Sequence, residues 1–179
     1  MRITISGPAG SGKTTVCNKL SAALSFESVV FGQIFRDLAA EKGISLAELG
    51  KIAEKDRSID EMIDSRIVQT ARERYDIILE SRLAAHMLER NGIPAFKIYL
   101  HASPDVRIKR IGMRENGSAG EVLKATTDRQ MSEEKRYRMY YGIDINDTNV
   151  YDLIINTDEI DADQVIRRIL DALEDRGCL

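Results

Sequence analysis

The chain has 179 residues, of which 43% are hydrophobic and 31% charged, as expected for one soluble globular domain with a full core. Its net charge of −3 argues against a protein that coats nucleic acid, because such proteins carry an excess of basic residues. No apolar run approaches the length of a membrane span, and Cys17 and Cys178 lack the spacing of a metal site or disulfide framework. We therefore expect a cytoplasmic protein with free thiols, which binds neither nucleic acid nor membranes.

The most specific motif lies near the start of the chain. Alternating apolar residues over 3–5 predict a strand, and helical spacing follows over residues 16–24. Between them, residues 7–15 satisfy the phosphate-loop pattern G-x-x-x-x-G-K-[ST]. In such a loop, backbone N–H groups and the helix N-terminus bind phosphates, Lys13 reaches the β- and γ-phosphates of ATP, and the Thr14 hydroxyl ligates Mg²⁺. The predicted ATP-binding residues here are Gly7, Pro8, Ala9, Gly10, Ser11, Gly12, Lys13, Thr14 and Thr15.

Helical patterns dominate the part of the chain that follows. An apolar run over residues 28–31 predicts a buried strand, which ends at Gly32. Ser45 and Ser58 each precede a stretch of helical spacing and have a glutamate three residues later, which is the pattern of a capping box. Residues 32–74 are therefore predicted to be an all-helical insertion between two strands.

The second half of the chain alternates strands with helices. Residues 117–120 form its most linker-like stretch, a charged helix is predicted over 121–141, and Asp161 begins a closing amphipathic helix. Ser103 and Pro104 are typical of a helix start. The predicted strands are 75–79, 96–100 and 151–155.

This alternation predicts an α/β fold in which helices cover both faces of a parallel sheet. Ligands of such sheets bind beyond the carboxyl ends of the strands. The residues that follow the predicted strands are thus candidates for the site, and they are Gly7, Gly32, Glu80, His101 and Asn156. Glu80 is predicted either to support Mg²⁺ or to pair with a neighbouring arginine.

A phosphate loop is shared by GTPase switches, motor ATPases and kinases. The guanine-binding pattern N-K-x-D starts at Asn18 but lacks its aspartate, which argues against a GTPase. Transfer of a phosphoryl group to a second phosphate brings many negative charges together, so a kinase needs cations from several segments. Arginines occur at the starts of several loops and helices on the expected edge, at positions 36, 82, 107, 110, 129 and 136. This distribution favours a kinase.

Several segments resemble the nucleoside monophosphate kinases, and most closely the cytidylate kinases of the archaeal type. The similarity covers nearly the whole chain, and its most specific part joins residues 127–137 to the strand pattern at 151–157. The segments that carry the resemblance are 7–15, 32–36, 79–82, 127–137, 141–144 and 151–157.

The resemblance implies a P-loop NTPase-type three-layer sandwich with a central parallel sheet of about five strands, a helical insertion that binds the nucleoside monophosphate, and a lid. The chain would be a single monomeric domain over 1–179. Its predicted core comprises residues 1–31, 75–111 and 142–179, with the insertion at 32–74 and the lid at 112–141.

The resemblance also implies roles for individual residues. Arg36 and Arg82 would bind the phosphate of the acceptor, while Lys13, Arg129 and Arg136 would be catalytic, with the two lid arginines neutralising the transferring group. On the ATP side the candidates are Arg107 and Arg110. Within the insertion, the sequence itself leaves two interpretations of Asp60 and Arg66: they read the base, or they lie on a solvated helix face.

The predicted reaction is the Mg²⁺-dependent transfer of a phosphoryl group from ATP to CMP or dCMP, giving ADP and the diphosphate. One alternative is a related kinase with another acceptor, such as AMP or shikimate. Adenylate kinases usually carry Asp-Gly-Phe/Tyr-Pro-Arg where this chain has Glu80-Ser81-Arg82, and the Gly-Gly-Gly motif of shikimate kinases is absent from the sequence. The second alternative is a regulatory protein that binds ATP without transferring phosphate.

Overall fold

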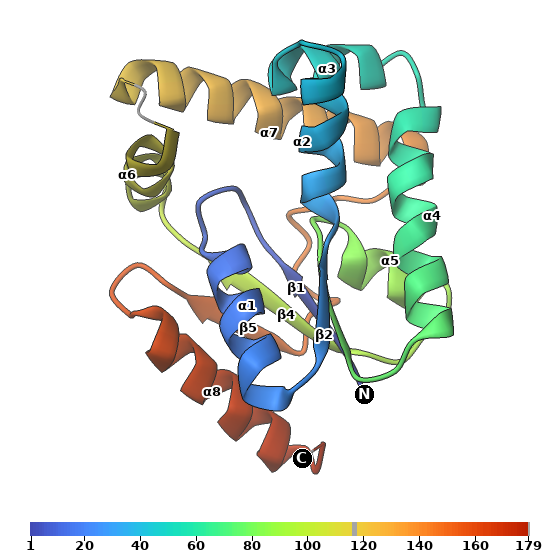
Figure 1. Ribbon diagram of the computed structural model, residues 1–179, viewed down its shortest axis with the longest axis vertical. Coiled ribbons are helices and arrows are strands. Elements are labelled where there is room, and N and C mark those ends of the chain that lie inside the picture. The colour runs from blue at the N-terminus through green and yellow to red at the C-terminus, as the bar shows by residue number, and fades with distance from the viewer. Residues whose placement is uncertain (116–117, 179) are drawn as a thin grey trace.

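In the computed structural model, which describes residues 1–115 and 118–178, a sheet of five strands forms the centre of the molecule (Figure 1). The strand order is β2-β3-β1-β4-β5, and every neighbouring pair is parallel. The strands are β1 (Arg2–Ser6), β2 (Glu27–Val30), β3 (Ile77–Glu80), β4 (Phe96–His101) and β5 (Leu153–Asn156). The predicted α/β class and the parallel sheet of five strands are confirmed.

Helices cover both faces of this sheet, because its strands are apolar on both sides. On one face, α1 (Lys13–Leu24) and α8 (Ala162–Asp175) enclose a buried cluster that includes Ile5 and Ile78. On the other face, α4 (Ser58–Glu73) and α5 (Ala84–Arg90) pack over Ile77 and Leu79. Successive side chains of β3 thus pack into the cores on opposite faces of the sheet, because side chains alternate between the two faces of a strand. The result is the predicted three-layer sandwich.

The remaining helices lie over the carboxyl edge of the sheet, where they can reach a bound ligand (Figure 1). They are α2 (Phe31–Glu41), α3 (Leu46–Ala53), α6 (Pro104–Glu115) and α7 (Ala119–Tyr141). Helix α7 packs against both α3 and α6, and so spans this edge from one side to the other. The residues between β2 and β3 are mostly helical, while the predicted limits of core, insertion and lid stay predictions.

Two predicted boundaries near the insertion are wrong. Strand β2 ends at Val30, and Phe31 starts α2, so Gly32 lies inside a helix rather than interrupting the pattern. The aromatic ring of Phe31 is buried beneath α4, and this packing outweighs its preference for a strand. The capping box at Ser45 is confirmed, but Ser58 is the first residue of its helix and not the cap. The N-cap is Arg57, whose side chain makes no capping hydrogen bond, and the Ser58 N–H group donates instead to the Asp56 side chain at 3.0 Å.

Other differences concern linkers and strand starts. Gly117 lies outside the described residues, but Ser118 caps α7 with Glu121 in a capping box, so 119–120 are helical rather than part of a linker. Strands β3 and β5 begin two residues later than predicted; before β3, Asp76 has a left-handed φ of 53°, which a strand cannot accommodate. No helix within the described ranges is both long enough and apolar enough to cross a membrane.

Candidate active site

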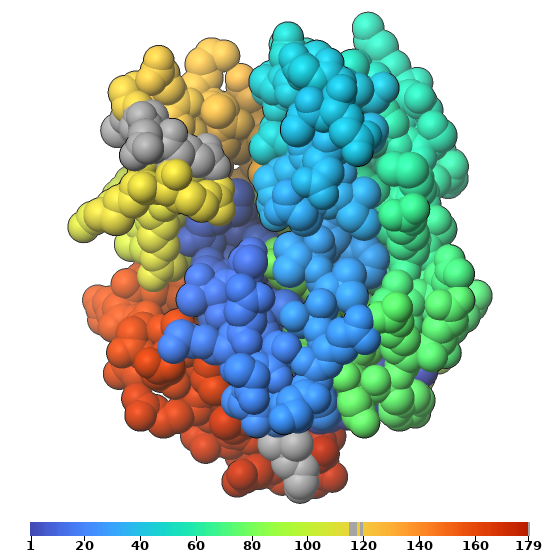
Figure 2. Space-filling model, in the orientation of Figure 1, coloured from blue at the N-terminus to red at the C-terminus, as the bar shows by residue number. Residues whose placement is uncertain are grey.

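A pocket of about 410 Å³ opens at the carboxyl edge of the sheet, between the phosphate-loop motif and side chains of α2, α4 and α7. Figure 2 shows the surface hollowed between α2, in blue, and α6, in yellow. Most of the predicted site residues line this pocket, although they come from distant segments. They are Ala9, Gly10, Ser11, Gly12, Lys13, Thr14, Thr15, Arg36, Asp60, Arg82, Arg110, Arg129 and Arg136.

The loop before α1 takes a shape that only glycine allows. Gly7 has a φ of 141°, and a Cβ atom there would lie 2.1 Å from the carbonyl oxygen of Leu100. Gly12 is the N-cap of α1, so the N-terminus of this helix opens into the pocket without a capping side chain. The hydroxyl of Ser11 is buried and lacks a hydrogen-bond partner among the described residues. A helix N-terminus and an unsatisfied hydroxyl therefore lie where an anion would be stabilised.

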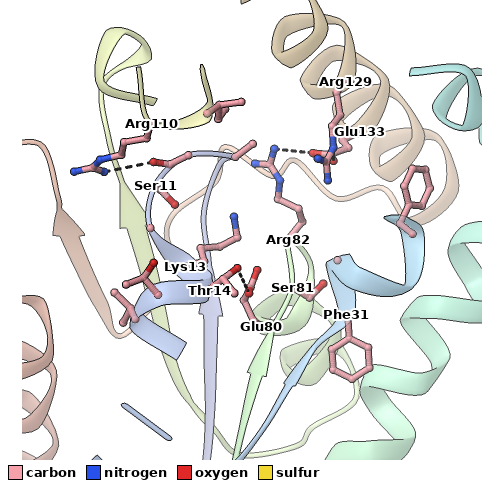
Figure 3. A pocket seen from close by; sticks show the side chains of 18 of the residues that line it. Ser11, Lys13, Thr14, Phe31, Glu80, Ser81, Arg82, Arg110, Arg129 and Glu133 are labelled. Carbon is pink, nitrogen blue, oxygen red and sulfur yellow. Dashed lines mark hydrogen bonds and ion pairs between the residues drawn. The ribbon is translucent and has the colours of Figure 1, made fainter. Parts of the chain in front are cut away.

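The two polar residues that follow Gly12 start α1 and point into the same space (Figure 3). Lys13 Nζ donates a hydrogen bond to the carbonyl oxygen of Pro8 at 3.0 Å. Burial, together with the nearby charge of Arg82, lowers the pKa of Lys13 to about 7. Thr14 Oγ1 donates to Glu80 Oε2 at 2.8 Å, which brings a carboxylate from the end of β3 beside the start of α1.

Across from the loop, Glu133 of α7 lies between two of the predicted arginines (Figure 3). Its Oε2 is 2.7 Å from Arg82 Nη2, and its Oε1 accepts from Arg129 Nε at 3.0 Å. Burial alone would raise the pKa of Glu133, but the charges of Arg82 and Arg129 outweigh it, and the pKa lies below its ordinary value. Arg82 and Arg129 are therefore held together by a buried carboxylate.

Arg136, one turn further along α7, belongs to a second buried ion pair. Its Nη1 donates to both carboxylate oxygens of Asp60 in α4, at 2.6 and 2.8 Å. The guanidinium also lies over the ring of Phe35, 5.3 Å from its centroid. Both charged side chains are almost fully buried, so this pair joins α7 to α4 at the wall of the pocket.

The predicted ATP-side arginines bond to the loop itself. Arg107 Nε donates to the carbonyl oxygen of Ala9 at 2.8 Å. Arg110 donates to Gly10 O at 3.4 Å and to the hydroxyl of Thr157, after β5, at 2.9 Å. Arg107 does not line the main pocket but a neighbouring cavity of about 160 Å³, which Gly7 and Pro8 also line. Both side chains therefore support the loop, Arg107 from the neighbouring cavity and Arg110 from the pocket itself.

The other predicted residues differ in their placement. Arg36 lines the pocket from α2, where Gln33 Oε1 accepts from its Nε at 3.0 Å. Asp60 also lies in the pocket wall, although as the partner of Arg136. Arg66 is exposed on α4 and is not among the residues that line the pocket. The fold thus gives no support to the predicted role of Arg66 in reading the base.

Sequence reasoning missed the positions of two acidic residues. Glu133 lies in a strongly charged helix without an obvious buried face, and yet it is buried in the site between Arg82 and Arg129. Asp64 lies on the buried face of α4, one turn after Asp60, and lines the pocket as well. The signal for Asp64 is its spacing: residues 60, 63, 64 and 67 share one helix face, and the isoleucines among them mark that face as buried.

Known proteins that this chain resembles in sequence share one description, cytidylate kinase. The model of the cytidylate kinase-like family matches residues 2–159. Cytidylate kinase from Natronomonas pharaonis is 47% identical over 165 residues, which cover 92% of this chain and 85% of that protein. Cytidylate kinase from Methanocaldococcus jannaschii is 41% identical over 97% of this chain and 98% of that protein. Among solved structures, shikimate kinase from Bacteroides thetaiotaomicron has a TM-score of 0.65 at 17% identity, covering 97% of this chain and 98% of that chain, which shows the fold alone. The chain belongs to the cytidylate kinase-like family.

Proposed function

We propose that the protein is a (d)CMP kinase, which transfers the γ-phosphoryl group of ATP to CMP or dCMP and yields ADP and the diphosphate. The observation that carries this proposal is a phosphate loop facing a cluster of arginines within one pocket. The relatives named cytidylate kinase, at 41–47% identity over most of the chain, support cytidine nucleotides as acceptors. We keep the cytoplasmic location and the monomeric state as predictions from the sequence.

The donor half of the site is the loop with Lys13. Its backbone and the N-terminus of α1 would bind the phosphates of ATP, and the Lys13 ammonium would neutralise charge on the β- and γ-phosphates. We assign Arg107 and Arg110 the task of holding the loop in shape, since both donate to its carbonyl oxygens. Arg107, which does not line the pocket, would act on ATP only through the loop, whereas Arg110 also lines the pocket.

The acceptor half is formed by the arginines opposite the loop. In the free protein, a carboxylate lies between Arg82 and Arg129, which is the arrangement that an acceptor or transferring phosphate needs. We propose that phosphate oxygens replace the Glu133 carboxylate as partners of these guanidinium groups, while Arg36 completes the acceptor site from α2. Arg136 would add positive charge from α7.

This arrangement needs no covalent intermediate. Phosphoryl transfer between two phosphates is accelerated by in-line positioning and by cations that balance the charge of the transition state. Closure of α7 over the phosphates would keep water from competing as the acceptor.

The side chains beside Lys13 fit a magnesium ion. Thr14 and Glu80 offer a hydroxyl and a carboxylate oxygen 2.8 Å apart, and Mg²⁺ prefers such hard oxygen ligands. We propose that these two residues hold the metal, directly or through its water ligands. When bound, it would neutralise charge on the β- and γ-phosphates.

A coupled assay of ADP release tests the proposed function. CMP, dCMP, UMP, AMP, GMP and shikimate are each offered with ATP and Mg²⁺, and kcat/KM is measured for each. We expect CMP to exceed AMP by more than about tenfold, which is roughly 1.4 kcal/mol in transition-state binding. A smaller preference would overturn the assignment to cytidine nucleotides, and no ADP with any acceptor would indicate a protein that only binds ATP.

A further inference from the structure

The part of the pocket between α2, α4 and α7 has the lining of a site for a planar base. Phe31, Phe35, Ile63 and Tyr137 supply apolar surface there. The polar groups among them are the Asp60–Arg136 ion pair and the side chain of Asp64. Small-molecule sites are mostly apolar with a few placed polar groups, which fix the orientation of the ligand.

The two aspartates of α4 differ in what they can still bind. Asp60 has both oxygens engaged by Arg136, at 2.6 and 2.8 Å. Asp64 is 4% exposed, and its Oδ2 makes no hydrogen bond within the part of the chain that the structure describes. A buried carboxylate oxygen without a donor is costly, so Asp64 Oδ2 is the acceptor in this wall that a ligand would satisfy.

Tyr141, at the end of α7, is the neighbouring donor. Burial raises the pKa of Asp64 to about 7, and the Tyr141 hydroxyl opposes this rise. Within the described residues, however, neither that hydroxyl nor Asp64 Oδ2 makes a well-formed hydrogen bond. Tyr141 lines a separate groove on the far side of α4, which Asp64 also borders. A purely structural role for Asp64 would therefore depend on Tyr141.

We infer that Asp64 accepts a hydrogen bond from the 4-amino group of the acceptor's cytosine and so selects cytosine over uracil. This inference rests on the proposed function, because it places the base of CMP in this part of the pocket. Cytosine presents an amino donor at position 4, where uracil presents a carbonyl oxygen. Above pH 7 Asp64 is ionised, and its carboxylate oxygen then attracts the amino group and repels the carbonyl oxygen. A buried acceptor left without its donor rejects the wrong base strongly.

The test combines a change in the protein with a change in the base. The kcat/KM values of wild type and Asp64→Asn are measured at pH 8 or above, where Asp64 is ionised, with CMP, with UMP and with the 2-pyrimidinone nucleotide, which lacks any group at position 4. Wild type is expected to lose about 10- to 100-fold when the amino group is removed, the range of a hydrogen bond to a charged group. In Asp64→Asn this loss should fall to less than about threefold, and the preference for CMP over UMP should drop at least tenfold, because an amide can donate to the uracil carbonyl.

Two control variants separate this role from packing. Asp60→Asn should lower activity with CMP and UMP by the same factor, since it acts through Arg136. Tyr141→Phe should leave the ratio of CMP to UMP unchanged. If Tyr141→Phe reproduced the ratio of Asp64→Asn, Asp64 would be a structural partner of Tyr141 and the inference would be wrong.

The outcomes also separate this inference from the proposed function. If wild type prefers CMP but treats the 2-pyrimidinone nucleotide equally well, the role of Asp64 is overturned and the kinase assignment stands. This comparison uses wild type alone, so it decides the question even if Asp64→Asn fails to fold. A wild type that phosphorylates neither CMP nor UMP would overturn both.

Discussion

On one side of the pocket, a single run of residues from Ala9 to Thr15 presents backbone groups and the start of a helix. On the other side, arginines from α2, from the segment after β3 and from α7 present long side chains. The first side takes its shape from glycine torsion angles and close backbone contacts. The second is held by buried carboxylates, with Glu133 between Arg82 and Arg129 and with Asp60 against Arg136.

This difference shows how a site can be kept intact before its ligand arrives. The loop side needs no counter-charge, because partial charges of backbone groups are fixed by the fold. The arginine side would repel itself without anions, so acidic residues hold the guanidinium groups together until phosphates replace them. Mutations should accordingly damage the two sides in different ways, through backbone strain on one and through unpaired charge on the other.

The largest effect is expected on the arginine side, from Arg136→Ala. Removing one partner of a buried ion pair leaves the other charge uncompensated, which typically costs about 3–5 kcal/mol in the free energy of unfolding. Urea denaturation would measure this loss. Burial raises the folded-state pKa of Asp60 above its ordinary value, and loss of Arg136 would raise it further, so the destabilisation should shrink as the pH falls and Asp60 binds a proton.

The double variant Asp60→Asn/Arg136→Gln provides the control, because it removes both charges and keeps similar volume. It should recover most of the lost stability. A double variant as unstable as Arg136→Ala would mean that the pair is not held by charge, and that unpaired charge does not distinguish the arginine side from the loop side.

On the loop side, Lys13→Met should act on catalysis more than on folding. Loss of one preorganised cation at the phosphates is expected to lower kcat about 10²- to 10³-fold, or about 3–4 kcal/mol, as for the loss of a single oxyanion donor. Lys19→Met is the matched control on the same helix, since Lys19 forms an exposed ion pair with Asp163 away from the pocket. Steady-state assays with CMP would show the effect, and equal losses in the two variants would contradict the role given to Lys13.

Backbone strain can be isolated by a pair of glycine variants. Both Gly7 and Gly12 have φ values in the left-handed region, so alanine is strained at either. At Gly7 the new Cβ atom would also meet the Leu100 carbonyl oxygen, whereas at Gly12 no described atom lies within 4 Å. We expect Gly7→Ala to destabilise the protein by about 2 kcal/mol more than Gly12→Ala in urea unfolding. Similar losses would show that torsion angle alone governs the loop.

The smallest effect concerns the pH dependence of ATP binding. The pKa of Lys13 in the free protein is about 7, and phosphates would raise it in the complex. Above pH 7 binding must therefore take up a proton, and the dissociation constant of ATP should rise by up to about tenfold per pH unit between pH 7.5 and 8.5. Calorimetry in buffers of different ionisation enthalpy would detect the proton, and Lys13→Met should abolish the uptake.

The sequence predicted the loop side of the site almost completely, because a contiguous motif fixes both its residues and its shape. It also indicated which arginines face the loop. It did not reveal that Glu133 is buried between Arg82 and Arg129, or that Asp60 binds Arg136. Those pairings depend on where α7, which packs against α3 and α6, places its side chains relative to β3 and α4. Local errors had local causes: burial of Phe31 overrode its strand preference, and the N-cap of α4 is Arg57 rather than Ser58, whose N–H group donates to Asp56.

The place of β1 in the sheet has a consequence for how the protein is made. This strand comes first in the chain but lies between β3 and β4, whose residues begin at Ile77 and Phe96. Parallel pairing over such a separation closes a long loop of chain. β1 therefore cannot pair on both edges until the residues of β3 and β4 have been translated. The turn at Gly7 also rests against Leu100. A nascent chain that ends before residue 100 therefore contains the whole phosphate-binding motif but lacks the contacts that give it its shape.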